Sequence, residues 1–199
     1  MGILLAAGHG RRFAALSGGA DKLLAPLPGG MAVAAASARA LLAAVEVVVA
    51  VVRPDSRALA AVLQTEGCRV LMAAQAREGM GASLAAAADH WRSAGAAGMA
   101  CAPGRVLVAL ADMPWIRPET HAKVLAGMQR SAIAAPLFEG ERGHPVAFDA
   151  SLLSELAALR GETGARDLIR RHGLALVATD DPGVLRDVDT PLDLDSPEA

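Results

Sequence analysis

Short apolar runs alternate with alanine-rich stretches of helical length, and this alternation constrains the fold more than any other feature of the chain. The run at residues 45–52 is continuous and rich in valine, which is typical of a strand buried on both faces of a sheet. Strands that alternate with helices form a mostly parallel sheet with helices on both faces. We therefore expect one three-layer α/β/α domain with a Rossmann-like, mostly parallel sheet over residues 1–199.

The order of the expected elements changes in the last third of the chain. Two short strands flank a charged turn at residues 139–143, which indicates an antiparallel element. Residues 94–104 are small and predict an irregular connection. The expected strands cover residues 3–6, 45–52, 68–72, 105–111, 131–136, 145–148 and 174–178, and the expected helices cover residues 31–44, 54–64, 82–93, 118–130, 152–159 and 165–171.

The first apolar run ends in a loop at residues 8–12 that contains two glycines and two arginines, and Lys22 follows. Glycine lets a ligand approach the backbone closely, and freed backbone N–H groups can hold phosphate oxygens. Arginine can bind a phosphate through two parallel hydrogen bonds. The loop matches neither a dinucleotide fingerprint, because Phe13 replaces the third glycine, nor a P-loop. It predicts a polyphosphate site, and the alternative is a glycine turn with solvated arginines.

Composition limits the partners of the chain. The 19 Lys and Arg residues against 21 Asp and Glu residues give a net charge of −2, and aromatic residues make up 3%, so the basic, aromatic surface of a nucleic-acid binder is not expected. No apolar run approaches a membrane span, and the first residues do not form a signal peptide. Cys68 and Cys101 form no Cys-x-x-Cys motif. We expect a cytoplasmic protein with free thiols and no membrane partner.

Two aspartates are candidate metal ligands. Asp112 directly follows the fourth expected strand, and ligands of such sheets bind beyond the carboxyl ends of the strands. Mg²⁺ needs only one or two protein carboxylates when phosphates supply further ligands. The alternative role of Asp112 is to cap the turn before Pro114. Asp189 shares one side of an extended segment with Asp187, and the alternative there is a helix start capped by Thr190.

Residues 75–83 form a further candidate segment. Gly79 and Gly81 permit close contact with a base or ribose, and Ser83 lies near a helix N-terminus; a glycine-rich helix entry without a ligand is the alternative. His144 lies in a turn and is typical of a surface residue. The other histidines lack the spacing of zinc ligands, and no Gly-x-Ser-x-Gly motif supports covalent catalysis.

Seven short segments in order along the chain resemble the molybdenum cofactor cytidylyltransferases, which have a MobA-like NTP transferase domain with the nucleotide-diphospho-sugar transferase fold. They cover residues 5–13, 21–24, 78–84, 110–114, 143–145, 161–166 and 187–191. The resemblance implies transfer of CMP from CTP to the terminal phosphate of molybdopterin, with release of pyrophosphate and with a molybdenum hydroxylase as a partner. Ala7 resembles the cytidylyl branch, because the guanylyl branch typically has glycine there. The alternatives are a GTP-using or other-acceptor transferase and a non-catalytic cofactor carrier.

The resemblance and the loop chemistry together give roles to individual residues. Arg12, Lys22 and Asp112 would be catalytic, and Asp112 and Asp189 would hold Mg²⁺ as the cofactor. Phe13 in place of methionine and the long spacing between Arg12 and Lys22 depart from the family pattern. The binding residues would be, for the acceptor, His144 and Arg166, and, for CTP, Leu5, Ala6, Ala7, Gly8, Gly10, Arg11, Arg12, Lys22, Gln75, Gly79, Gly81 and Ser83.

Overall fold

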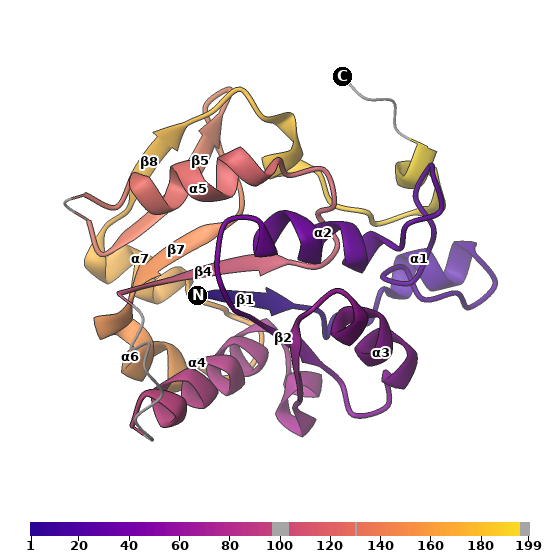
Figure 1. Ribbon diagram of the computed structural model, residues 1–199, viewed down its shortest axis with the longest axis horizontal. Helices are drawn as coiled ribbons and strands as arrows, with labels where there is room; N and C mark the ends of the chain where they lie inside the picture. Colours follow the sequence, from indigo (N-terminus) through magenta and orange to yellow (C-terminus); the bar gives the residue numbers. More distant parts are fainter. Residues whose placement is uncertain (97–103, 130, 196–199) are drawn as a thin grey trace.

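The computed structural model describes residues 1–96, 104–129 and 131–195, and within them one eight-stranded sheet forms the centre of the molecule (Figure 1). The strand order is β3-β2-β1-β4-β7-β5-β6, and β8 pairs with β5. The first four strands are parallel, whereas β7 runs antiparallel to both β4 and β5. The strands are β1 (Gly2–Leu5), β2 (Val48–Val52), β3 (Arg69–Met72), β4 (Arg105–Leu110), β5 (Ile133–Phe138), β6 (Glu141–Arg142), β7 (Val146–Asp149) and β8 (Ala175–Ala178).

Helices cover both faces of the sheet, as the alternation predicts. Neighbouring strand residues point to opposite faces, so Leu4 packs in one apolar core and Ile3 in the other. Helices α2, α3 and α5 contribute to the first core, and α4, α6 and α7 contribute to the second. The α-helices are α1 (Arg11–Leu16), α2 (Val33–Leu42), α3 (Arg57–Thr65), α4 (Met80–Ala96), α5 (Pro118–Ala126), α6 (Leu153–Ala157) and α7 (Arg166–His172), and the 3₁₀ helices are η1 (Ala74–Glu78), η2 (Ala150–Leu152), η3 (Pro182–Leu185) and η4 (Pro191–Asp195).

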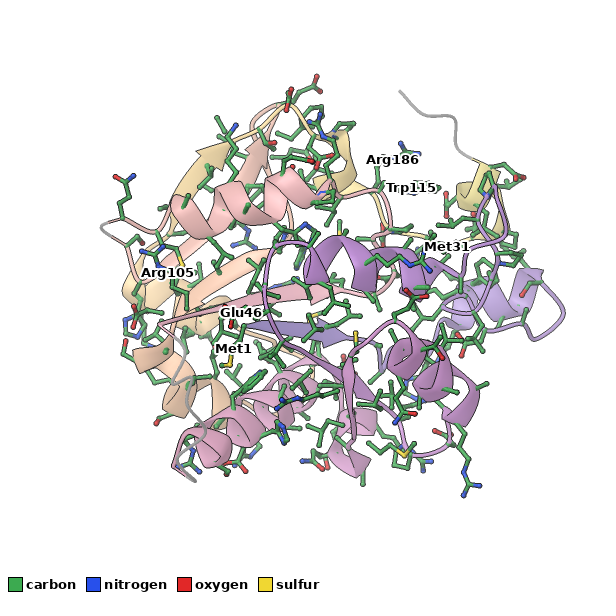
Figure 2. The ribbon with its side chains drawn as sticks, in the orientation of Figure 1. Met1, Met31, Glu46, Arg105, Trp115 and Arg186 are labelled. Carbon is green, nitrogen blue, oxygen red and sulfur yellow. The ribbon has the colours of Figure 1, made fainter. Side chains whose placement is uncertain are left out.

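The parallel strands β1 and β4 are neighbours although a hundred residues separate them in the chain. Gly2 at the start of β1 pairs with Leu107, and the Met1 amino group donates to the Arg105 carbonyl at 3.3 Å (both residues are labelled in Figure 2). Their carboxyl ends point toward α1 and the C-terminal segment (Figure 1). The chain leaves β1 for β2 on one side, and β4 lies on the other side of β1, so a crevice is expected between the loops that follow β1 and β4.

The structure corrects several expected elements. Residues 11–16 form α1, which the sequence analysis treated as loop and spacer, and residues 141–142 form β6 rather than part of a turn. Helix α5 ends at Ala126 instead of residue 130, because Gly127 packs so closely that a Cβ there would lie 2.3 Å from Val177. The other ends differ by at most three residues. The irregular connection expected at residues 94–104 falls largely outside the described residues, as does Cys101. None of the described helices has the length and apolar character to cross a membrane.

Cys68 gives the fold a measurable dependence on alkaline pH. Burial raises the pKa of its thiol from 9.0 to about 11, and the nearby Glu66 charge acts in the same direction. The unfolded chain therefore loses this proton first, and stability is expected to fall as the pH rises from about 9 to about 11. The loss should be about 1 kcal/mol, because water screens part of the burial cost. Urea unfolding across this pH range should show a flatter profile for Cys68→Ser, and parallel profiles would contradict the assignment.

Candidate functional site

A cavity of about 220 Å³ lies where β1 and β4 end. The loop after β1, the start of α4 and the residue that follows β4 all contribute to its wall. Its lining residues are Leu5, Ala7, Gly8, His9, Lys22, Leu23, Ala76, Gly79, Met80, Ser83, Leu110, Asp112 and Glu162. The cavity therefore lies at the edge of the sheet where the strand order reverses, which is the usual ligand position in such folds.

Lys22 connects this cavity to two carboxylates. Its Nζ donates to Oδ2 of Asp112 at 2.7 Å and to Oδ1 of Asp189 at 3.4 Å, and Arg12 contacts the other oxygen of Asp189 at 2.7 Å. Burial works against the charge of Lys22, but the two carboxylates outweigh it, so the pKa of Lys22 is raised above 10.5. Lys22 is a cation near neutral pH. The long segment between Arg12 and Lys22 consists of the rest of α1 and the chain that leads back from it, so Lys22 still reaches the site.

Backbone hydrogen bonds place the two carboxylates on neighbouring segments. The Val188 amide donates to the Asp112 carbonyl at 2.8 Å, which joins the C-terminal segment to the end of β4. The Ser37 hydroxyl of α2 donates to the Ala111 carbonyl at 3.0 Å and fixes the same turn from the other side. Residues far apart in the sequence thus form one rigid support for Asp112.

The segment after Asp189 is capped differently from the expectation. The Asp193 side chain accepts hydrogen bonds from the amides of Asp189 and Thr190 at 2.9 and 2.6 Å, and from the Thr190 hydroxyl at 2.9 Å. The 3₁₀ helix η4 begins at Pro191, directly after Thr190, as expected, but the Thr190 hydroxyl donates to Asp193 instead of accepting from the helix backbone. The turn holds the backbone of Asp189 while leaving its carboxylate to Lys22 and Arg12.

Arg53 sets the orientation of the loop after β1. Its Nη1 donates to the carbonyl of Ala7 at 3.0 Å and to the carbonyl of Gly8. The C=O and N–H of a trans peptide point in opposite directions, so the amides of Gly8 and His9 point away from Arg53. Both residues line the cavity. Arg53 therefore fixes the orientation of two peptide groups beside the cavity, although it is not itself part of the cavity lining.

The structure gives Gly79 and Gly81 a role that differs from the sequence interpretation. A Cβ on Gly81 would lie 2.8 Å from the Gly161 carbonyl oxygen, and one on Gly79 would lie 2.7 Å from the Glu162 side chain. The Gly81 amide also donates to the Gly161 carbonyl at 2.8 Å. Close packing of the segment at residues 160–162 requires these glycines, and Gly79 also lines the cavity. The buried Ser83 hydroxyl donates to the Gly79 carbonyl at 3.0 Å.

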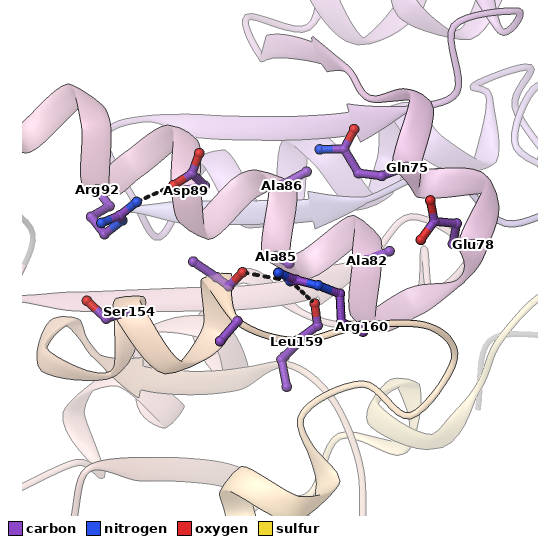
Figure 3. A pocket seen from close by; sticks show the side chains of 12 residues that line it. Gln75, Glu78, Ala82, Ala85, Ala86, Asp89, Arg92, Ser154, Leu159 and Arg160 are labelled. Carbon is purple, nitrogen blue, oxygen red and sulfur yellow. Dashed lines mark hydrogen bonds and ion pairs between the residues drawn. The ribbon is translucent and has the colours of Figure 1, made fainter.

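Other residues predicted for the site lie outside the cavity lining. The Ala6 side chain is buried in the core, and Gln75 lies on a separate groove of about 630 Å³ between α4 and α6 (Figure 3). Arg11 is exposed at the start of α1, and Arg166 is exposed at the start of α7. Gly10 adopts φ 53° as the N-cap of α1, which explains the glycine by backbone conformation.

His144 is half-buried, not the surface residue that its turn position indicates. Its amide donates to the Val184 carbonyl at 3.0 Å, and a Cβ on the preceding Gly143 would lie 2.2 Å from that oxygen. Burial lowers the pKa of His144, Asp112 opposes this effect, and Arg142 adds to it. The imidazole is therefore neutral near pH 7 and lies within the electrostatic range of Asp112.

Asp112 and Asp189 fit a cation that takes oxygen ligands and completes its shell with water and phosphate. Both carboxylates contact the same lysine nitrogen, so they converge on one position. Over residues 1–96, 104–129 and 131–195, no three His, Cys, Asp or Glu side chains form a group that could hold a metal by itself. Two carboxylates with substrate oxygens match Mg²⁺, whereas a structural zinc site needs four nitrogen or sulfur ligands.

Sequence reasoning did not assign several contributors to the site. Arg53 orients the loop, and the further cavity-lining residues are His9, Leu23, Ala76, Met80, Leu110 and Glu162. His9 and Glu162 lie inside segments that the family resemblance had already singled out. Arg53 follows β2, and only the parallel pairing of β1 with β2 brings it to the loop after β1.

The fold and the site together define the class of the protein. A cavity at the switch point of a parallel sheet, a glycine loop with oriented amides, and a lysine between two aspartates are typical of proteins that bind nucleotide phosphates. The chain belongs to the family of MobA-like NTP transferase domains, whose model matches residues 2–176. The resemblance seen in the sequence is thereby confirmed, as is the expected fold class.

Relatives of known sequence or structure cover nearly the whole chain. "Nicotine blue oxidoreductase" of Paenarthrobacter nicotinovorans is 29% identical over 95% of this chain and 91% of its own length. "Purine catabolism protein PucB" of Bacillus subtilis is 27% identical over 98% of this chain and 94% of its own length. The structure of Rv0371c from Mycobacterium tuberculosis is 26% identical, has a TM-score of 0.76 and covers 96% of this chain and 93% of its own, and the same protein has also been solved with manganese.

Proposed function

We propose that this protein transfers CMP from CTP to the terminal phosphate of molybdopterin. The observation that carries this function is Lys22 held between Asp112 and Asp189 at the mouth of a cavity that the glycine loop borders. A pure binding protein has no need of a carboxylate pair suited to a divalent cation. The family is that of NTP transferase domains, which supports nucleotidyl transfer as the reaction.

The nucleotide would lie in the cavity with its phosphates on the loop after β1. The amides of Gly8 and His9, which Arg53 orients, would donate to phosphate oxygens. Lys22 and Arg12 would turn from the carboxylates toward the charge that develops on the leaving pyrophosphate. Gly79 and Ser83, in the opposite wall, would border the base.

The transfer step needs no general base. An oxygen of the acceptor phosphate forms a bond to the α-phosphorus of CTP, and the bond from that phosphorus to the bridging oxygen of pyrophosphate breaks. The acceptor phosphate is already ionised near neutral pH, so no proton has to leave. Asp112 and Asp189 would hold Mg²⁺, which when bound supplies neutralisation of phosphate charge. The protein contributes position and charge.

On the acceptor side, the neutral imidazole of His144 can donate to a phosphate oxygen from the turn beside Asp112. Arg166 is exposed at the start of α7 and would be available to an anion. Both assignments come from the family segments that contain these residues. A molybdenum hydroxylase would be the protein that receives the finished cofactor.

Ala7 is the proposed determinant of CTP, and a pyrophosphate assay tests both the reaction and this choice. Purified protein with Mg²⁺ and molybdopterin is expected to release pyrophosphate from CTP and not from GTP. Ala7→Gly should gain activity with GTP, because the added space admits the larger base. Release that requires GTP in the wild type would overturn the nucleotide assignment, and release without molybdopterin would overturn the acceptor.

A second candidate is a carrier that delivers the molybdenum cofactor during hydroxylase maturation. The names of two relatives, a purine catabolism protein and a nicotine blue oxidoreductase, favour it, since neither is that of a nucleotidyltransferase. A carrier would bind molybdopterin tightly and release no pyrophosphate from any nucleotide, which separates it from the transferase.

Arg53→Lys is expected to weaken CTP binding about tenfold, a loss of roughly 1.4 kcal/mol. Lysine keeps the charge but cannot serve both carbonyls with one planar group, so the Gly8 and His9 amides lose their fixed direction. Isothermal titration with CTP measures the effect. Arg57→Lys on α3 is the matched control, because Arg57 is exposed and does not line the cavity. Equal CTP affinity in both variants would show that Arg53 does not position the loop after β1 for CTP.

A further inference from the structure

A second hollow, of about 670 Å³, lies beside the segments that carry the two candidate metal ligands. Its size is within the range of small-molecule pockets. Trp115 provides an aromatic surface, and the guanidinium of Arg186 lies over that ring at 5.6 Å from its centre (Figure 2). Met31, Ala36 and Ile116 add apolar area to the wall. The hollow thus combines an aromatic ring with a planar guanidinium, so a flat ring can stack there while its anionic group pairs with the guanidinium.

Arg186 is the arginine of this hollow that is available to a ligand. The Arg39 guanidinium makes two contacts with the Glu66 carboxylate, one of them at 3.1 Å. The Arg117 guanidinium contacts the Asp180 carboxylate at 2.6 Å. Within the described part of the chain, Arg186 forms no ion pair within 4.0 Å; its guanidinium lies on the face of Trp115 and is within electrostatic range of Asp193. A ligand anion can therefore recruit Arg186 without breaking an existing ion pair.

The hollow is tied to the candidate catalytic carboxylates through the chain itself. Trp115 lies three residues after Asp112, and Arg186 lies three residues before Asp189. Three residues span at most about 11 Å of backbone, so both groups lie close to the carboxylates. The bond from the Val188 amide to the Asp112 carbonyl joins the two segments. Asp112 and Lys22 line the neighbouring cavity and not this hollow, so a molecule with its ring on Trp115 has to pass the turn at residues 112–115 to bring a phosphate to them.

We propose that the Trp115–Arg186 hollow receives the ring system of the acceptor, a planar anionic heteroaromatic molecule of the pterin type. This assignment rests on the proposed transfer reaction and adds the surface on which the acceptor lies. The hollow borders the apolar core formed with α2 and α5, whereas Arg166 begins α7, which packs in the other core. The nucleotide and the acceptor ring would approach Asp112 from different faces of the sheet.

Tryptophan fluorescence offers a direct test that needs no turnover. The chain has two tryptophans, and Trp91 is buried in α4 with an indole nitrogen that has no hydrogen-bond partner, so Trp91→Phe leaves Trp115 as the single reporter at little structural cost. Titration of this variant with pterin-6-carboxylate, with inner-filter correction, is expected to quench Trp115. Adding Arg186→Ala should raise the dissociation constant about tenfold. Arg57→Ala controls for the change in net charge, and Arg166→Ala tests the rival position.

Each outcome of this titration decides between assignments. Absence of quenching, or a loss of affinity in the Arg166 variant without one in the Arg186 variant, would overturn the hollow as the acceptor surface. Quenching by CMP as strong as that by the pterin would mark it as a nucleotide site instead. Pyrophosphate release that depends on molybdopterin, with an acceptor KM unchanged by Arg186→Ala, would leave the proposed reaction standing while removing this site. Quenching by the pterin without any pyrophosphate release would keep the hollow as a pterin-binding surface while removing the proposed reaction.

Discussion

Replacing Asp112 by alanine is expected to lower nucleotidyl transfer by at least about 1,000-fold. Asp112 is the carboxylate that directly ends β4, contacts Lys22 at 2.7 Å and lines the cavity. Its loss removes one of the two oxygen donors proposed for Mg²⁺ and leaves Lys22 with Asp189 alone. The position of Lys22 and the neutralisation of phosphate charge are then both impaired. The fold should persist, because the backbone bond from the Val188 amide to residue 112 does not need the side chain.

The rate of pyrophosphate release at saturating CTP and molybdopterin measures this effect. Glu46→Ala is the matched control, since it removes one carboxylate that is exposed and does not line the cavity. The control should retain activity within a few-fold of the wild type. Near-normal turnover in the Asp112 variant would remove the metal and catalytic assignments of this residue.

Replacing Gly183 by alanine is expected to lower the free energy of unfolding by about 2–4 kcal/mol. A Cβ at this position would lie 2.2 Å from the carbonyl oxygen of Trp115 and 2.8 Å from the amide nitrogen of Ile116. These are backbone atoms, so relief requires movement of a whole segment rather than of a flexible side chain. The Gly183 amide also donates to the buried Asp181 side chain at 3.0 Å, which resists that movement.

Urea unfolding monitored by circular dichroism measures the stability of the Gly183 variant. Gly8→Ala serves as the comparison, because a Cβ on Gly8 would meet nothing within 4 Å and its φ is not in the left-handed region. The Gly8 variant should unfold within about 0.5 kcal/mol of the wild type. Equal stability of the two variants would show that the segment before Asp189 is not held by close packing against Trp115.

Local pattern predicts the layers of this fold but not the order of its strands. Strand β2 is buried along its whole length, as its valine-rich composition predicts, whereas Glu46 near the start of the run is exposed. The antiparallel β7 lies between β4 and β5, and no local signal gives that position, because strand order follows from which apolar faces pack together. Helix α1 was missed for a similar reason. Its six residues are too few for a periodic pattern, and Phe13 alone is buried.

The candidate site, like the fold, could be predicted from the sequence only in part. Lys22 and Asp112 were singled out from the ends of their segments, and the structure brings them into contact across ninety residues. Arg53 could not be found this way, because its partners are backbone carbonyls on a neighbouring strand's loop. The glycines of residues 79–81 were correctly marked as places of close approach, but the approaching group is the segment around Gly161. The glycines in the sequence show that a side chain would not fit at these positions, but they do not show which group packs there.

The most direct measurement follows the α-phosphate of CTP. Protein is incubated with molybdopterin, Mg²⁺ and CTP labelled at either the α- or the γ-phosphate, and the products are separated. We expect the α-label in the molybdopterin product and the γ-label in pyrophosphate, in equal amounts. A folded sample that leaves the α-label in CTP, or transfers it only to a different acceptor, would contradict the assignment of this protein as a transferase that joins CMP to molybdopterin.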